Sequence, residues 1–115
     1  MVFRWILAIL IIAHSLIHIL GGFSELKIAQ FNNLSGRTLF PVAGFARKIL
    51  GAAWLVAMIL LLMSAGELLF SGPGFLPLAL AGTALSQMLI IVWWPDAKWG
   101  TVANALIIIG ILLYK

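Results

Sequence analysis

The sequence contains no cysteine and little charge, and both absences limit what the protein can be. Without cysteine there can be no disulfide, thiolate metal site or cysteine nucleophile. Only 9% of the 115 residues are charged, whereas a soluble domain typically carries about a quarter. Acids are scarcest, with three Asp and Glu against seven Lys and Arg. So few charges cannot cover a globule in water, but they suffice for the ends and loops of a helical bundle whose sides face lipid.

Long apolar runs take up most of the chain, with 64% hydrophobic residues and a mean hydropathy of +1.21. A helix of about 20 such residues, rising about 1.5 Å each, crosses the hydrocarbon core of a bilayer. We expect one all-α integral membrane domain over residues 1–115, a four-helix transmembrane bundle. Short turns between the last three helices favour up-down topology. The predicted spans are residues 2–22, 49–70, 75–94 and 97–114.

The first span could also be a cleaved signal peptide, since Arg4 precedes its apolar stretch. Two histidines in the stretch and the poor cleavage site at Leu20-Gly21-Gly22 favour a retained helix. Residues 23–47 are the one long connection. Their apolar positions at helical spacing predict a short interfacial amphipathic segment, with an irregular loop as the alternative.

The connection between the third and fourth spans carries strong boundary signals. Trp93 and Trp94 are typical of the membrane interface, where indole rings gather. Pro95 is expected to end the third helix, because proline lacks the N–H that a helix interior needs. The carboxylate of Asp96 is expected to cap the fourth helix by accepting backbone N–H bonds.

Positive charges predict the orientation, because an even number of spans places both termini on one side. The termini side carries two basic residues, Arg4 and Lys115. The opposite side carries five: Lys27, Arg37, Arg47, Lys48 and Lys98. The positive-inside rule therefore places loops 23–47 and 94–99 in the cytoplasm and both termini outside. Basic residues beside apolar spans suit lipid headgroups, so we expect membrane lipids as partners and not nucleic acid.

The few polar side chains within the spans fall at a similar depth. His18 and His14 lie about 6 and 12 Å from the cytoplasmic end of the first span. On the same count Gln87 lies about 10 Å and Asn104 about 9 Å from that side. Unpartnered amides and imidazoles cost several kcal/mol in lipid, so they should face inward. The predicted ligand-binding residues are His14, His18, Trp54, Gln87 and Asn104.

This polar layer has several possible roles. It could be a hydrogen-bond network that only fixes packing, a pocket for a lipid headgroup, quinone or small amphiphile, or a proton relay. A metal or haem at His14 and His18 fits less well, because zinc sites want three or four protein ligands and axial haem ligands approach opposite faces. We find no nucleophile–base–acid pattern in the sequence and no acid in mid-membrane, so we assign no catalytic or metal residue.

Three segments together resemble a group of small bacterial four-span membrane proteins. Ala13–Gly21 resembles their AHxLIHxxG opening, and Gly51–Leu55 resembles part of their second helix. Ser86–Asn104 resembles their SQ…WxDAK[FW]GTxAN segment. The resemblance implies a bacterial inner-membrane protein of four helices and implies no activity. In size and helix number the chain more distantly resembles DoxX-like membrane proteins.

The leading hypothesis is a binding or accessory membrane protein. Its polar layer would hold a lipid-like or quinone-like ligand, or would dock a protein partner or a second copy of the chain. The rival hypothesis is a membrane-embedded enzyme that acts on a lipid or quinone with His14 or His18 as the base. A third hypothesis is a structural subunit whose polar layer only stabilises packing.

Overall fold

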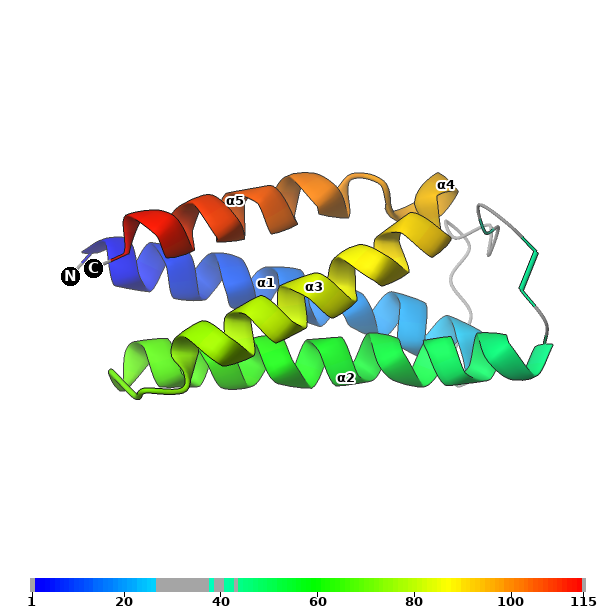
Figure 1. Cartoon of the computed structure of the whole chain (residues 1–115), viewed down its shortest axis with the longest axis horizontal. Coiled ribbons are helices and arrows are strands. Elements are labelled where there is room, and N and C mark those ends of the chain that lie inside the picture. Colours follow the sequence, from blue (N-terminus) through cyan, green and yellow to red (C-terminus); the bar gives the residue numbers. More distant parts are fainter. Residues whose placement is uncertain (1, 27–37, 39–40, 43, 115) are drawn as a thin grey trace.

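The structure is a computed structural model. The residues it describes are 2–26, 38, 41–42 and 44–114, with the backbone alone for Ser24, Glu25 and Asp96. Its helices are α1 (Val2–Glu25), α2 (Gly44–Leu69), α3 (Phe75–Val92), the short α4 (Trp94–Ala97) and α5 (Gly100–Leu113). The described part of the chain is all-helical, and its four long helices form the predicted bundle (Figure 1).

Three of these helices are long and apolar enough to cross a membrane. They are Val2–Phe23 of α1, Gly44–Leu69 and Phe75–Val92. The protein is therefore a multi-pass membrane protein. The fourth long helix, α5, is apolar but has only 14 residues. Large apolar side chains on the outside of the bundle, among them Ile9 and Leu112, are well exposed, as expected for a surface that lipid covers.

Successive long helices run in alternating directions (Figure 1). The start of α1, the end of α5 and the α2–α3 turn lie at one end of the bundle, here named the termini end (Figure 1). The start of α2 and the short α4 lie at the opposite end, here named the α4 end. A hydrogen bond ties the termini end together, because Arg4 Nη1 donates to Ser71 Oγ at 3.0 Å.

The α2–α3 turn ends α2 by a motif common at helix C-termini. The N–H of Gly72 donates to the carbonyl of Glu67 at 2.7 Å, and Ser71 has a φ of 55°. A left-handed residue followed by this six-to-one hydrogen bond is a Schellman motif, which satisfies carbonyls that the helix leaves open. Gly72 also lies so close to the Glu67 carboxylate that a β-carbon there would collide with it.

The boundary between the third and fourth predicted spans differs from the prediction. Helix α3 ends at Val92, and Trp93 has φ −101° and ψ 38°, outside the helical region. A separate turn of helix, α4, follows with Pro95 in its first turn, where proline is tolerated because that N–H has no helical partner. Asp96 therefore lies inside α4, and α5 begins at Gly100 rather than at residue 97.

The predicted interfacial segment, residues 23–47, lies mostly outside the described residues. At its two ends the structure describes helix: α1 continues to Glu25, and α2 begins at Gly44 rather than at residue 49. Helix α2 therefore starts five residues before the predicted span. A glycine at the first position of a helix costs little, since the penalty for glycine applies to the helix interior.

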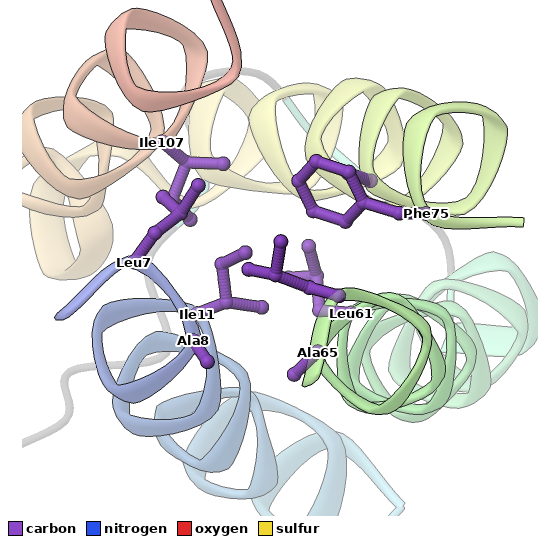
Figure 2. Packing of buried hydrophobic residues seen from close by; sticks show 9 residues of the cluster. Leu7, Ala8, Ile11, Leu61, Ala65, Phe75 and Ile107 are labelled. Carbon is purple, nitrogen blue, oxygen red and sulfur yellow. The ribbon is translucent and has the colours of Figure 1, made fainter. Parts of the chain in front are cut away.

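Two apolar clusters fill the bundle. The first lies toward the termini end, where side chains from all four long helices meet (Figure 2). It comprises Leu7, Ala8, Ile11, Leu61, Ala65, Leu68, Phe75, Ala79 and Ile107. The second lies toward the α4 end and comprises Trp54, Ala57, Leu89, Ile90 and Trp93. Between helices α1 and α2, Gly22 allows a close approach, because a β-carbon there would lie 2.6 Å from Leu55 Cδ2.

Candidate functional site

A direct hydrogen bond between α1 and α5 begins the polar network. Nε2 of His14 lies 2.7 Å from Oδ1 of Asn104, and the two side chains are 4% and 3% exposed. An amide oxygen only accepts, so His14 Nε2 carries the proton and donates it. The bond therefore fixes the neutral His14 ring as its Nε2–H tautomer.

His18, one helical turn later, takes the opposite tautomer. Its Nδ1 lies 2.9 Å from the backbone carbonyl of His14, which can only accept. Nδ1 of His18 therefore carries the proton, and Nε2 has a lone pair. That lone pair faces Ser86 Oγ of α3 at 2.7 Å, so Ser86 donates to His18.

The amide group of Asn104 links α5 to α3. Its Nδ2 donates to Ser86 Oγ at 3.2 Å and to Gln87 Oε1 at 3.0 Å. The amide nitrogen of Gln87 in turn donates to Thr101 Oγ1 at 3.1 Å. Both amides therefore use their oxygen and their nitrogen inside the bundle.

These bonds close on themselves, and we name the set His14, Asn104, Ser86 and His18 the hydrogen-bond circuit. Each member donates to the next, and His18 donates back to the carbonyl of His14. Hydrogen bonds that run in one direction polarise each other and strengthen the set. The circuit joins α5 to both α1 and α3.

A row of rings in edge-on or tilted contact leads from the circuit to the α4 end, and we name it the aromatic ladder. The ring centroids of His14 and His18 lie 4.8 Å apart, those of His18 and Trp54 5.3 Å, and those of Trp54 and Trp93 5.8 Å. Above Trp93, the guanidinium carbon of Arg47 lies 5.9 Å from the ring centroid, within reach of a cation–π contact. The ladder thus connects the buried network to a charged group of α2.

The two indoles of the ladder have buried donors without acceptors. Nε1 of Trp54 and Nε1 of Trp93 have no hydrogen-bond partner among the described residues, although the side chains are only 6% and 3% exposed. Both pack in the second apolar cluster. A buried donor left unsatisfied costs about 1–3 kcal/mol, and native structures contain few of them. These two N–H groups are therefore the donors of the site that lack an acceptor, and a ligand would reach them only after the side chains around them move.

The structure brings four of the five sequence-predicted site residues into one network. His14, His18, Gln87 and Asn104 are connected by the bonds above. Trp54 contacts the His18 ring, but its N–H does not join the network. Burial and bonding show where these side chains lie, and their predicted role in binding a ligand stays a prediction.

Ser86, Thr101 and Trp93 belong to the site but were not predicted as site residues. In the sequence, Ser86 and Thr101 appeared only within the segment that resembles the bacterial four-span proteins, and Trp93 only as an interfacial indole. The signal for Ser86 was its helical face, since Thr83, Ser86 and Ile90 are buried on one side of α3. Trp93 gave no such signal, because its inward position depends on the break between α3 and α4.

The two histidines do not form a metal site with other described residues. No group of three or more His, Cys, Asp or Glu side chains lies close enough to hold a metal in the described part of the chain. Both ring nitrogens of His18 already have hydrogen-bond partners. A metal bound to His18 would therefore have to displace one of these hydrogen bonds.

Ser86 and His18 form a pair that sequence spacing alone could not reveal. A hydroxyl 2.7 Å from an imidazole lone pair, with the far nitrogen of the imidazole oriented by a carbonyl, is the geometry of a serine nucleophile and its base. The Ser86 side chain is fully buried, however. A substrate would reach it only after the helices separate.

No protein-family model, curated protein or solved structure matches the chain.

Proposed function

We propose that this multi-pass membrane protein binds a lipid-like or quinone-like amphiphile at the α4 end of its bundle. The observation that carries the proposal is the pair of buried, unpartnered indole N–H groups of Trp54 and Trp93. Their indole rings supply flat apolar surface, and their N–H groups supply hydrogen-bond donors. Ligand sites in proteins combine these two features.

In this proposal the hydrogen-bond circuit positions the site and does not itself contact the ligand. His18 packs against Trp54, and its ring orientation is fixed by bonds from both nitrogens. Gly21, also on α1, lies against the same indole, because a β-carbon there would be 2.7 Å from Trp54 ring atoms. Trp54 therefore packs against both a fixed imidazole and the backbone of α1.

The test is native mass spectrometry of protein extracted gently from membranes. We expect a bound amphiphile on the unaltered protein and its loss from the double variant Trp54→Phe with Trp93→Phe, which keeps aromatic rings and removes both donors. The matched control is Trp99→Phe, because Trp99 is 75% exposed and lies outside the ladder. An unchanged ligand profile in the double variant would contradict the proposal.

A second candidate is a membrane-embedded enzyme in which His18 acts as the base for Ser86. The 2.7 Å contact between Ser86 Oγ and His18 Nε2 favours it. A fluorophosphonate ester probe should then label Ser86 and not Ser64, an equally buried serine whose hydroxyl donates to the carbonyl of Leu61. Protein in membranes that stays unlabelled at Ser86 would remove this candidate.

We further propose that the protein lies in a bacterial inner membrane with its α4 end in the cytoplasm. The resemblance to small bacterial four-span proteins and the excess of Lys and Arg at this end support the proposal. The chain has no native cysteine, so single cysteines can be labelled without background. In intact cells, an impermeant maleimide should modify Ser71→Cys and leave Lys98→Cys unmodified. The opposite pattern would reverse the orientation.

A further inference from the structure

We infer that the ligand presents an uncharged carbonyl oxygen to the indole donors of Trp54 and Trp93. The inference rests on the proposed function and specifies the chemistry of the bound group. An indole N–H donates and cannot accept, so two such groups select a ligand by its acceptors. The site offers these two donors without partners, packed among apolar side chains, with the His18 ring against Trp54 and the Arg47 guanidinium over Trp93.

The surroundings of the donors favour a neutral acceptor over an anionic one. Ala57, Leu89 and Ile90 are the other buried members of the cluster that holds the two indoles. A phosphate or carboxylate placed among them would lose its hydration, and an ion is far more costly to desolvate than a carbonyl group. An anionic headgroup would instead lie outward, toward the charged side chain of Arg47 above Trp93.

Of the two indoles, Trp93 lies nearer to the α4 end of the bundle. Trp93 lies at the break between α3 and α4, with a backbone conformation outside the helical region. Trp93 is only 3% exposed, so its indole must move before a ligand can enter there. Trp54 lies within α2 and packs against His18 and Gly21 of α1. An acceptor entering at the α4 end would meet Trp93 first and Trp54 next along the ladder.

Two kinds of membrane molecule carry this chemistry, and both fit the inference. A quinone has ring carbonyls and a flat face that can stack on an indole. A glycerolipid has the ester carbonyls of its acyl chains, located just below the headgroup. In both, the neutral C=O group accepts the indole proton. The quinone and the glycerolipid differ in the molecule that carries the carbonyl, and a titration with each one distinguishes them.

The experiment observes the indole N–H resonances of ¹⁵N-labelled full-length protein by NMR. The protein is placed in nanodiscs of a dialkyl ether phosphatidylcholine, which has no carbonyl group. One sample receives an alkylated benzoquinone and a second receives the matching diacyl ester phosphatidylcholine. A third receives an alkylbenzene of equal chain length as the control without a carbonyl. Resonances are assigned with single Trp→Phe variants, or through the contact between Trp54 and Gly21 in the unaltered protein if a variant does not fold.

We expect the indole N–H resonances of Trp54 and Trp93 to move downfield, as those of hydrogen-bonded protons do. The indole resonance of the exposed Trp99 should stay in place. A saturable shift with the quinone alone identifies a quinone, and a shift with the ester lipid alone identifies an acyl ester. If the quinone and the ester lipid both cause a shift, the recognised group is the carbonyl that the two molecules share. If neither sample shifts while native mass spectrometry still detects a bound amphiphile, the carbonyl inference is wrong and the proposed function stands. If neither a shift nor a bound amphiphile is found, both are wrong.

Discussion

Removal of the Asn104 amide should destabilise the bundle more than any other single truncation of a polar side chain. Asn104 is 3% exposed and bonds to three other side chains: His14, Ser86 and Gln87. Hydrogen bonds between helices in membranes contribute about 0.6 kcal/mol each on average. Asn104→Ala should therefore lower the free energy of unfolding by about 2 kcal/mol, since the three partners lose their bonds together.

Thr83→Val is the matched control on α3. Thr83 is buried like Asn104, but its hydroxyl has no hydrogen-bond partner among the described residues. Replacing that hydroxyl by a methyl group should leave stability within about 0.5 kcal/mol or raise it, because an unsatisfied polar atom is removed. The two variants thus compare a polar side chain with partners against one without.

The measurement is reversible unfolding in lipid bicelles, followed by steric trapping. A double-mutant cycle between Asn104→Ala and His14→Ala should give a coupling of about 0.6–1.7 kcal/mol for their direct bond. Equal effects of Asn104→Ala and Thr83→Val, or a coupling near zero, would refute the reasoning. The circuit would then be a consequence of packing and not one of its causes.

Other expected outcomes concern helix contact and protonation. Gly22→Ala should destabilise the protein, because its β-carbon would lie 2.6 Å from Leu55 Cδ2 and 3.2 Å from a backbone oxygen of α2. Gly66→Ala, within α2 and with no atom inside 4 Å of the added carbon, should stabilise it by about 0.5–1 kcal/mol; thermal unfolding of both variants checks the contrast. In ¹⁵N NMR of the neutral rings, His14 should carry its proton on Nε2 and His18 on Nδ1, and one shared tautomer would contradict the circuit.

The sequence was sufficient to predict the bundle and the depth of its polar side chains. Apolar length predicts spanning helices, and a rise of about 1.5 Å per residue predicts the level of each side chain along its helix. Because lipid cannot satisfy an imidazole or an amide, an inward orientation follows as well. His14 and Asn104, far apart in the chain, meet at 2.7 Å for these reasons.

The direction of the hydrogen bonds and the helix ends could not be predicted in the same way. The partner of His18 is Ser86 and not Gln87, and that choice depends on the rotation of α3 about its axis. Such rotation is set by packing between helices, which hydropathy does not encode. At the α3–α4 boundary, the tryptophans, Pro95 and Asp96 each indicated a helix end or start at a different residue. Because α4 begins at Trp94, Asp96 lies within a helix rather than before one.

The shortness of α5 has a consequence for the surrounding bilayer. Its 14 residues span about 21 Å, whereas a typical hydrocarbon core is about 30 Å thick. Lipid chains beside α5 therefore meet a shorter apolar helix than those beside α1 or α2. A bilayer adapts to such mismatch by thinning locally or by tilting the helix. Thinning on one side of the bundle would draw headgroups and interfacial water toward Asn104 and Thr101, the polar residues in the first half of α5.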